Sequence, residues 1–120
     1  MNIGVLETME APELREYLRF LLWHYRVMDG FWFLFVEKEY GRKAAEYLDE
    51  LVWAKIAGMS AKDLVQRFNI QEKGIKGLVK ALQFLPWTML VGYHVSQTGE
   101  DEALVTVPEC PTQMARVKHG

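Results

Sequence analysis

The sequence predicts an α+β fold in a single domain spanning residues 1–120, with four or five N-terminal helices packed on a small antiparallel β-hairpin. Apolar residues recur at three- and four-residue spacing as far as Pro86, which is typical of helices. After Pro86 they recur at every second position, which is typical of strands. Half of the residues are hydrophobic and 12% are aromatic, which is enough apolar material for a folded core.

The first helix is predicted after Thr8, because Pro12 and Glu13 suit the first turn of a helix. Asp29-Gly30 is expected to end it. Its apolar stripe comprises Leu14, Tyr17, Leu18, Leu21, Leu22, Tyr25 and Met28, and Phe20, Trp23 and Val27 widen it. Because the stripe is so wide, we expect this helix to be covered on more than one side.

The next segment opens with six consecutive apolar residues at positions 31–36, which suit a buried strand and a buried helix equally well. The polar residues that follow favour a helix that ends with Gly41 at the C′ position. A further helical pattern covers residues 42–57 and is expected to stop at Gly58. Its apolar face comprises Ala45, Leu48, Val52 and Ile56.

Two shorter helices are predicted within residues 60–85. Ser60 suits the N-cap of the first, with Asp63 in the capping-box position. Asn69 is expected to turn the chain in the left-handed conformation, which asparagine tolerates. The second helix is expected from Gln71 onwards, and its two glycines, Gly74 and Gly77, should each weaken it by about 1 kcal/mol relative to alanine.

The same region has the rhythm of a helix-turn-helix, in which two short helices pack around a tight turn and the second enters the DNA major groove. Lys73, Lys76 and Lys80 would then be available to phosphates, and the hairpin would resemble the wing of a winged helix. Plain packing of two amphipathic helices gives the same rhythm. The second helix contains no arginine, and the predicted wing loop is acidic, which counts against DNA binding.

A β-hairpin is predicted over residues 87–108, with a five-residue loop from Gln97 to Asp101. The register that places apolar residues on one shared face pairs Val95 with Ala103, Tyr93 with Val105 and Val91 with Val107. A two-stranded hairpin is marginal alone and has two open edges. We therefore expect a second subunit, or a continuation of the chain, to complete the sheet.

Composition excludes several classes of protein. The net charge of −2 gives no overall field that would attract a polyanion, and a single cysteine excludes an internal disulfide framework and fits the cytoplasm. The N-terminus does not resemble a signal peptide, and the longest apolar run is too short to cross a bilayer. Because no Glu-x-x-His pair occurs at helical spacing, we predict no metal site and no cofactor.

The candidate nucleophile is the single cysteine, Cys110, which directly precedes Pro111 and a short helix predicted over residues 111–119. Backbone N–H groups at a helix N-terminus lower the pKa of a thiol, and Arg116 one turn later adds positive charge. In the register above, His94 opposes Leu104 and lies roughly 20 Å along the strands from Cys110, too far to act as its base. A small, inert thiol is the alternative interpretation.

Aromatic residues offer a second candidate feature. Trp32, Trp53 and Trp87 are typical of a hydrophobic core, although a ligand pocket could use the same residues. Glu37 and Glu39 would suit a metal site only if a second carboxylate or a histidine converged on them, and a solvated acidic face is the alternative interpretation. Glu37 is also a candidate ligand-binding residue.

Three segments together resemble an uncharacterised family of prokaryotic cytosolic proteins, some of whose relatives are labelled L-2-amino-thiazoline-4-carboxylic acid hydrolase-like. The segments are HYRVMDGFWFLFVEKEYGRKAAEYLDELVW, GIKGLVKALQFLPW and CPTQMARVKHG. The resemblance implies that the C-x-x-Q-x-x-R pattern of Cys110, Gln113 and Arg116 is a signature of the family. It also implies a further segment with more cysteines and another strand, so we expect the domain to be incomplete at Gly120.

Three functions are therefore predicted, and whether the chain is an enzyme stays open. The first is a cytoplasmic small-molecule-binding domain with hydrolase ancestry. Its site residues would be Cys110 as the catalytic group and Gln113, Arg116, Trp32, Trp53 and Glu37 as the ligand-binding groups. The second is a winged-helix DNA-binding module that uses the three lysines. The third is a non-catalytic subunit that dimerises through its sheet edges.

Overall fold

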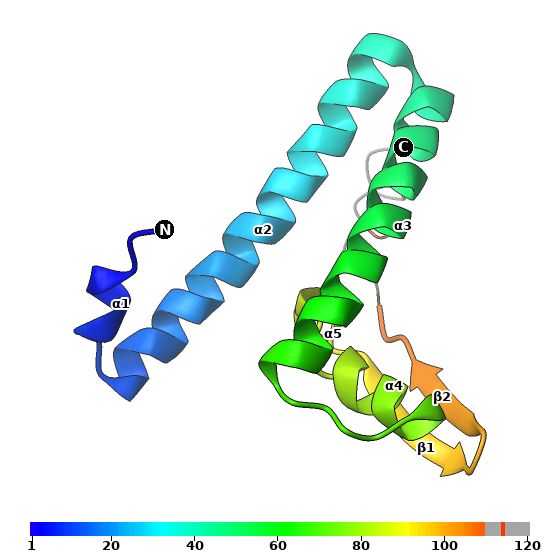
Figure 1. Cartoon of the computed structure of the whole chain (residues 1–120). Helices are drawn as coiled ribbons and strands as arrows, with labels where there is room; N and C mark the ends of the chain where they lie inside the picture. The colour runs from blue at the N-terminus through cyan, green and yellow to red at the C-terminus, as the bar shows by residue number, and fades with distance from the viewer. Residues whose placement is uncertain (110–113, 115–120) are drawn as a thin grey trace.

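The computed structural model describes residues 1–109 and 114, and within them the chain has an α+β fold of five helices and a two-stranded antiparallel sheet (Figure 1). The elements are α1 (Gly4–Glu7), α2 (Ala11–Tyr40), α3 (Arg42–Arg67), α4 (Gly74–Leu82), α5 (Pro86–Val91), β1 (His94–Gly99) and β2 (Glu102–Thr106). The predicted fold class is confirmed. Apart from Met114, which is helical, the helix predicted over residues 111–119 lies outside the described residues.

The two longest helices, α2 and α3, form an antiparallel hairpin that turns at Gly41. Gly41 has a φ of 86°, which favours glycine, and its N–H donates to the carbonyl of Glu37 at 2.8 Å. The predicted helix end at Gly41 is therefore confirmed. From this turn the two helices diverge, so the N-terminal half of α2 lies well away from α3 (Figure 1).

Two predicted helix ends are wrong. Asp29-Gly30 does not end the first helix, since α2 continues from Ala11 to Tyr40, and Gly58 and Ser60 lie inside α3. A glycine inside a helix costs only about 1 kcal/mol relative to alanine, which packing and neighbouring helix-forming residues offset. Ser60 therefore caps nothing. A capping box lies instead at the start of α2, where the Glu10 N–H donates to the Glu13 carboxylate at 3.3 Å.

The strand predicted from Trp87 is also wrong, because residues 86–91 form α5. Pro86 occupies the first turn, where its missing N–H costs nothing, and Gly92 ends the helix in the left-handed conformation with a φ of 73°. The Thr88 hydroxyl donates to the carbonyl of Leu82 at 2.6 Å and fixes α5 against the end of α4. These end signals outweigh the two-residue alternation that suggested a strand.

The hairpin is shorter than predicted, and its register differs by two residues. Val95 pairs with Val105, and Gln97 rather than Val95 pairs with Ala103. The irregular step between Gln97 and Gly99 brings Gly99 opposite Glu102, so the loop is tighter than five residues. The sheet packs against α4, which contacts both strands. Neither edge of this sheet is covered by a third strand within the described residues.

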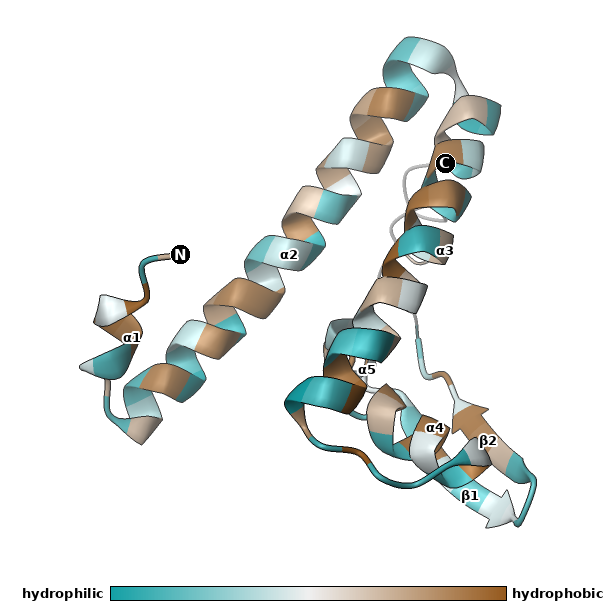
Figure 2. Cartoon of the chain, in the orientation of Figure 1, coloured by the Kyte–Doolittle hydropathy of each residue, from teal (hydrophilic) through white to brown (hydrophobic). Residues whose placement is uncertain are grey.

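The buried core is small for a chain of this length. Among the described residues, the buried hydrophobic side chains are Phe33, Ala45, Ile70, Ala81 and Val91. Large apolar side chains instead lie exposed along both long helices, and Figure 2 shows hydrophobic stretches over the whole length of α2. The long helices therefore bury each other only in part.

The turn between α3 and α4 contains the one non-glycine residue with positive φ among the described residues, Asn69, at 49°. Its predicted left-handed conformation is confirmed. Ile70 follows it into the core and is 6% exposed, and its N–H donates to the carbonyl of Val65 at 3.0 Å. The helix after the turn begins at Gly74 rather than at the predicted Gln71.

Replacing Asn69 with alanine is expected to lower the free energy of unfolding by about 1 kcal/mol, because the left-handed conformation strains a residue with a Cβ and no local hydrogen bond. Asn69→Gly should be close to neutral, since glycine adopts that conformation freely. Urea unfolding followed by circular dichroism measures both. Equal stabilities for the two variants would contradict the assigned role of this residue.

None of the helices in the described part of the chain is sufficiently long and apolar to span a membrane.

Candidate functional site

The predicted catalytic and anion-binding residues, Cys110, Gln113 and Arg116, lie outside the described residues. Two other features of the described chain are candidates for function. One is a cluster of aromatic rings between α2, α3 and α5. The other is the exposed apolar side of α2 that faces away from α3.

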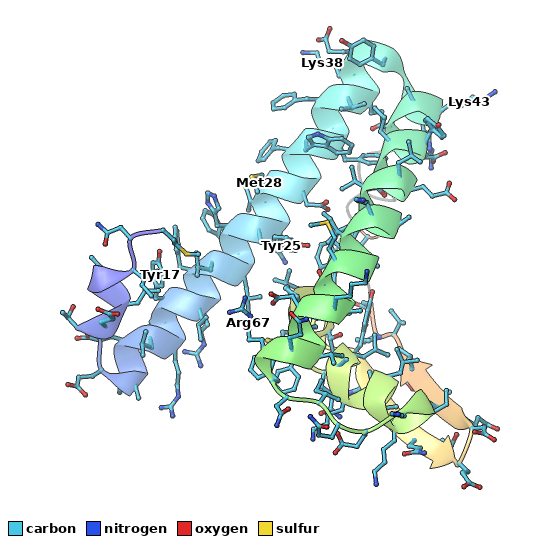
Figure 3. The ribbon with its side chains drawn as sticks, in the orientation of Figure 1. Tyr17, Tyr25, Met28, Lys38, Lys43 and Arg67 are labelled. Atoms are coloured by element: carbon cyan, nitrogen blue, oxygen red, sulfur yellow. The ribbon has the colours of Figure 1, made fainter. Side chains whose placement is uncertain are left out.

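The aromatic cluster consists of Tyr25 from α2, Trp53 from α3 and Trp87 from α5. The ring centroids of Trp53 and Trp87 are 5.5 Å apart, and the Tyr25 ring lies 6.4 Å from the first and 6.0 Å from the second in edge-on contacts. Figure 3 shows Tyr25 on the side of α2 that faces α3. All three rings are half-buried, so the cluster joins three helices and still reaches solvent.

Polar groups border this cluster. The Trp53 indole Nε1–H donates to the Asp49 carboxylate at 3.1 Å, one turn earlier on α3. Burial, with a smaller contribution from the negative charge of Asp29, raises the pKa of the Tyr25 hydroxyl above its ordinary value. An apolar surface with carboxylates at its rim suits a ligand that has a flat apolar body and a hydrogen-bond donor or positive charge.

The other predicted ligand-binding residues lie apart from this cluster. Trp32 is 38% exposed and lies about two turns along α2 from Tyr25, and among the described residues no ring contact joins it to Trp53. Glu37 lies beside the turn at Gly41, where its charge adds to the effect of Glu46 in raising the pKa of Arg42. Of the predicted ligand-binding residues, the cluster contains Trp53, together with Trp87, which the sequence analysis named as a possible pocket residue. Tyr25 was visible in sequence only as one member of the apolar stripe.

The lysines of the DNA-binding alternative are exposed, but they do not form one free basic surface. Lys80 Nζ donates to the Glu72 carboxylate at 2.9 Å, and this hydrogen bond lowers the pKa of Glu72. Lys73 precedes α4, and Lys76 lies on it. Leu78, which the motif would bury, is 51% exposed. Nucleic-acid binding stays a prediction, and the steep weakening of binding by salt would test it.

The second candidate feature is the outer face of α2, defined here by its exposed apolar residues opposite α3. It comprises Phe20, Trp23, Met28, Phe31, Leu34 and Phe35, each between 49% and 61% exposed. Figure 3 shows Met28 on the side of α2 away from α3. The rings of Phe31 and Phe35 stack at 5.9 Å, and those of Phe20 and Trp23 lie 6.0 Å apart, so each pair forms an apolar patch on this face.

Metal chemistry finds no support in the part of the chain that is described, where no three metal-binding side chains come together. An open depression on α3 is lined by Ala61, Lys62, Val65 and Gln66, and it contains none of the predicted site residues. The described geometry therefore defines a helical-hairpin protein with an exposed apolar helix face and an aromatic cluster near the middle of the hairpin.

Comparison with known proteins places the chain in a family whose function is unknown. The chain belongs to a family of unknown function (DUF6125), whose sequence model matches residues 13–120. No curated protein and no solved structure matches the chain. The prediction of an uncharacterised family is confirmed, whereas the relationship to a thiazoline-carboxylate hydrolase stays a prediction.

Tyr25 makes the stability of the fold dependent on pH in the alkaline range. Because its pKa is raised in the folded chain, the unfolded chain loses this proton first as the pH rises. The free energy of unfolding should therefore be unaffected below the ordinary tyrosine pKa of 10.0 and should fall as the pH rises through the higher folded value. Urea unfolding between pH 8 and about 11 measures this effect. Tyr25→Phe should flatten the alkaline slope, and an unchanged slope would exclude Tyr25 as its source.

Proposed function

We propose that this chain is a non-catalytic assembly subunit of the cytoplasm, in which the α2–α3 hairpin presents an apolar helix face that another polypeptide covers. The observation that carries the proposal is the outer face of α2, where six large apolar side chains are about half exposed. Soluble monomers rarely expose continuous apolar patches of more than a few hundred Å² unless the patch binds something.

The size of the face supports this proposal. A fully buried aromatic side chain removes about 150–250 Å² from water, so four half-exposed aromatic residues present roughly 400 Å². Met28 and Leu34 extend the same surface. The sequence led us to expect cover on more than one side of this helix, and the described part of the chain supplies cover on the α3 side. A protein partner would supply the rest.

The accessibility of the outer face can be measured with an apolar dye such as ANS, whose fluorescence rises when it binds exposed apolar surface. At low concentration, a folded monomer should bind the dye. A folded chain that does not bind the dye should be associated, with the outer face covered by its partner. A Phe31→Ser, Phe35→Ser variant should lose a clear part of the dye signal, since it removes two of the six exposed apolar residues of the face, while Tyr47→Ser on α3 should retain it. A monomer that binds no dye would overturn the proposal, since its outer face would already be covered by its own chain.

A second candidate function is small-molecule binding, favoured by the three rings that α2, α3 and α5 bring together. In this proposal Cys110, Gln113 and Arg116 supply an anion-binding group, and hydrolase ancestry would account for the cysteine. Thermal shifts across a metabolite library test it. Shifts that disappear in Trp53→Ala, Cys110→Ala and Arg116→Ala would support the site, and shifts unchanged in all three would remove it.

A further inference from the structure

The chain has far more accessible surface than a compact monomer of its size. Its accessible area is 9772 Å², whereas a folded monomer of 14.0 kDa has about 6,700 Å². Its radius of gyration is 16.9 Å, against about 14 Å for a compact domain of 120 residues. About half of the excess area remains even if the undescribed part of the chain is granted full exposure.

This remaining excess, roughly 1,500 Å², is larger than the surface that each partner loses in an ordinary stable complex, about 800 Å². It corresponds in size to one side of an obligate homodimer, in which the subunit is incomplete without its copy. The area alone does not indicate which partner covers this surface. The sequence pattern on the outer face of α2 indicates that the partner is a helix.

Residues on this side of α2, including the half-buried Tyr17 and Val27, are spaced as in a coiled coil. Tyr17, Phe20, His24, Val27, Phe31 and Leu34 follow one another at alternating steps of three and four. At about 100° per residue, this seam lies roughly opposite Phe33, the buried residue of α2. A heptad seam with aromatic and aliphatic knobs is the pattern by which one helix packs along another helix, not along a sheet or a small ligand.

The charges at the two ends of the seam specify the direction of the second helix. Glu16 lies at the N-terminal end on this face, with a side chain 70% exposed, and Lys38 lies at the C-terminal end. These two positions are equidistant from Val27, eleven residues on either side. An antiparallel copy centred on Val27 would place each Lys38 beside the Glu16 of the other copy. A parallel copy would place like charges together, which is unfavourable.

We propose, resting on the assembly function above, that the partner is a second copy of this chain, whose α2 packs antiparallel along the outer face of α2 with the two-fold axis at Val27. The two hairpins then form a four-helix arrangement with the paired α2 helices at its centre. The glutamate of the Glu16–Arg19 ion pair is solvent-exposed and stays available to Lys38 of the other copy. The small α1 lies beside the first turns of α2 (Figure 1). Further along the seam, Phe20, His24, Phe31 and Leu34 are exposed and Val27 is half-buried.

Light scattering and sedimentation of the full chain between 1 and 200 µM test the partner directly. A dimer is expected for the unmodified chain. Val27→Glu places two carboxylates at the axis, and it should weaken the dimer about 100-fold. Met59→Glu makes the same change at an exposed apolar residue of α3 and should leave the dimer unchanged. Circular dichroism shows whether each variant keeps its helices.

Disulfide formation tests the axis. In a Cys110→Ser background, Val27→Cys should form an intermolecular disulfide on mild oxidation, because residue 27 meets itself. Phe20→Cys should not, because Phe20 would lie beside Leu34 of the other copy. Cross-linking of both variants would indicate a parallel dimer and overturn the antiparallel arrangement. Charge reversal gives an independent result: Glu16→Lys and Lys38→Glu should each weaken the dimer about tenfold, and the double variant should restore it.

The outcomes separate this inference from the function on which it rests. A chain that is monomeric at 200 µM and binds ANS would exclude the second copy while leaving the assembly function in place. A monomer that binds no dye would exclude both. A dimer that survives Val27→Glu and Phe31→Glu would overturn the proposed face, because association would then use another surface such as the sheet edges.

Discussion

Gly77→Ala is expected to lower the free energy of unfolding by about 3 kcal/mol, the upper end of the usual cost of overpacking. A Cβ at residue 77 would lie 2.2 Å from the carbonyl oxygen of Glu72 and 2.9 Å from its carbonyl carbon. Both are backbone atoms, so no rotamer change relieves the contact. Glu72 can move only if the turn after α3 moves, and that turn is fixed by Asn69 and by the buried Ile70.

The matched control is Gly58→Ala, which makes the same change inside α3. A Cβ there meets nothing within 4 Å. Alanine should therefore stabilise the chain by up to about 1 kcal/mol through its higher helix propensity. Urea unfolding at one fixed protein concentration compares the variants, because association makes stability depend on concentration. If the two variants shifted the midpoint in the same direction, the close approach of α4 to Glu72 would be wrong.

Local signals predicted two of the turns correctly, although the number and length of the helices in the first half were predicted wrongly. Gly41 ends α2 and Asn69 turns left-handed, as their residue types indicated. Gly30 and Gly58 were wrongly predicted to end helices, because the small free-energy cost of a glycine inside a helix is offset by tertiary packing. Gly77 was predicted only to weaken α4. In the structure a glycine is required at this position, because α4 approaches the backbone of Glu72 too closely for a Cβ.

The α5 segment shows where periodicity fails. Trp87 and its neighbours alternate like a strand over a few residues, but Pro86 and Gly92 are good helix end signals on either side. A helix of six residues is too short for its own period to be recognised. The predicted hairpin register was wrong for the same reason, because it paired Val91, which belongs to α5, with Val107.

The candidate sites were predictable only in part. Trp53 and Trp87 could be named together from sequence, but Tyr25 could not, because meeting them depends on the angle at which α2 leaves the turn at Gly41. Phe20, Trp23 and Val27 indicated that α2 needs cover on a second side. What covers it could not be read from periodicity, since the same stripe suits a core, a partner and a pocket.

Trp53→Ala is expected to cost about 3 kcal/mol, the lower end of the range for removing a large aromatic side chain, because Trp53 is half-buried. The variant loses the contacts to Trp87 at 5.5 Å and Tyr25 at 6.4 Å, and with them a junction of three helices. Trp53→Phe keeps a ring and loses the indole hydrogen bond to Asp49, so it should cost about 1 kcal/mol.

Tyr47→Ala is the matched control for Trp53→Ala, since Tyr47 lies on the same helix and is 62% exposed. It should change the stability by less than about 0.5 kcal/mol. Near-ultraviolet circular dichroism distinguishes local from global loss, because two indoles in contact give a signal that neither gives alone. Hydrogen exchange should also quicken in α5 and the middle of α2 when Trp53 is removed, since the cluster joins both to α3. Exchange that quickens equally in α4 and the hairpin would contradict this local role and indicate a general weakening of the fold.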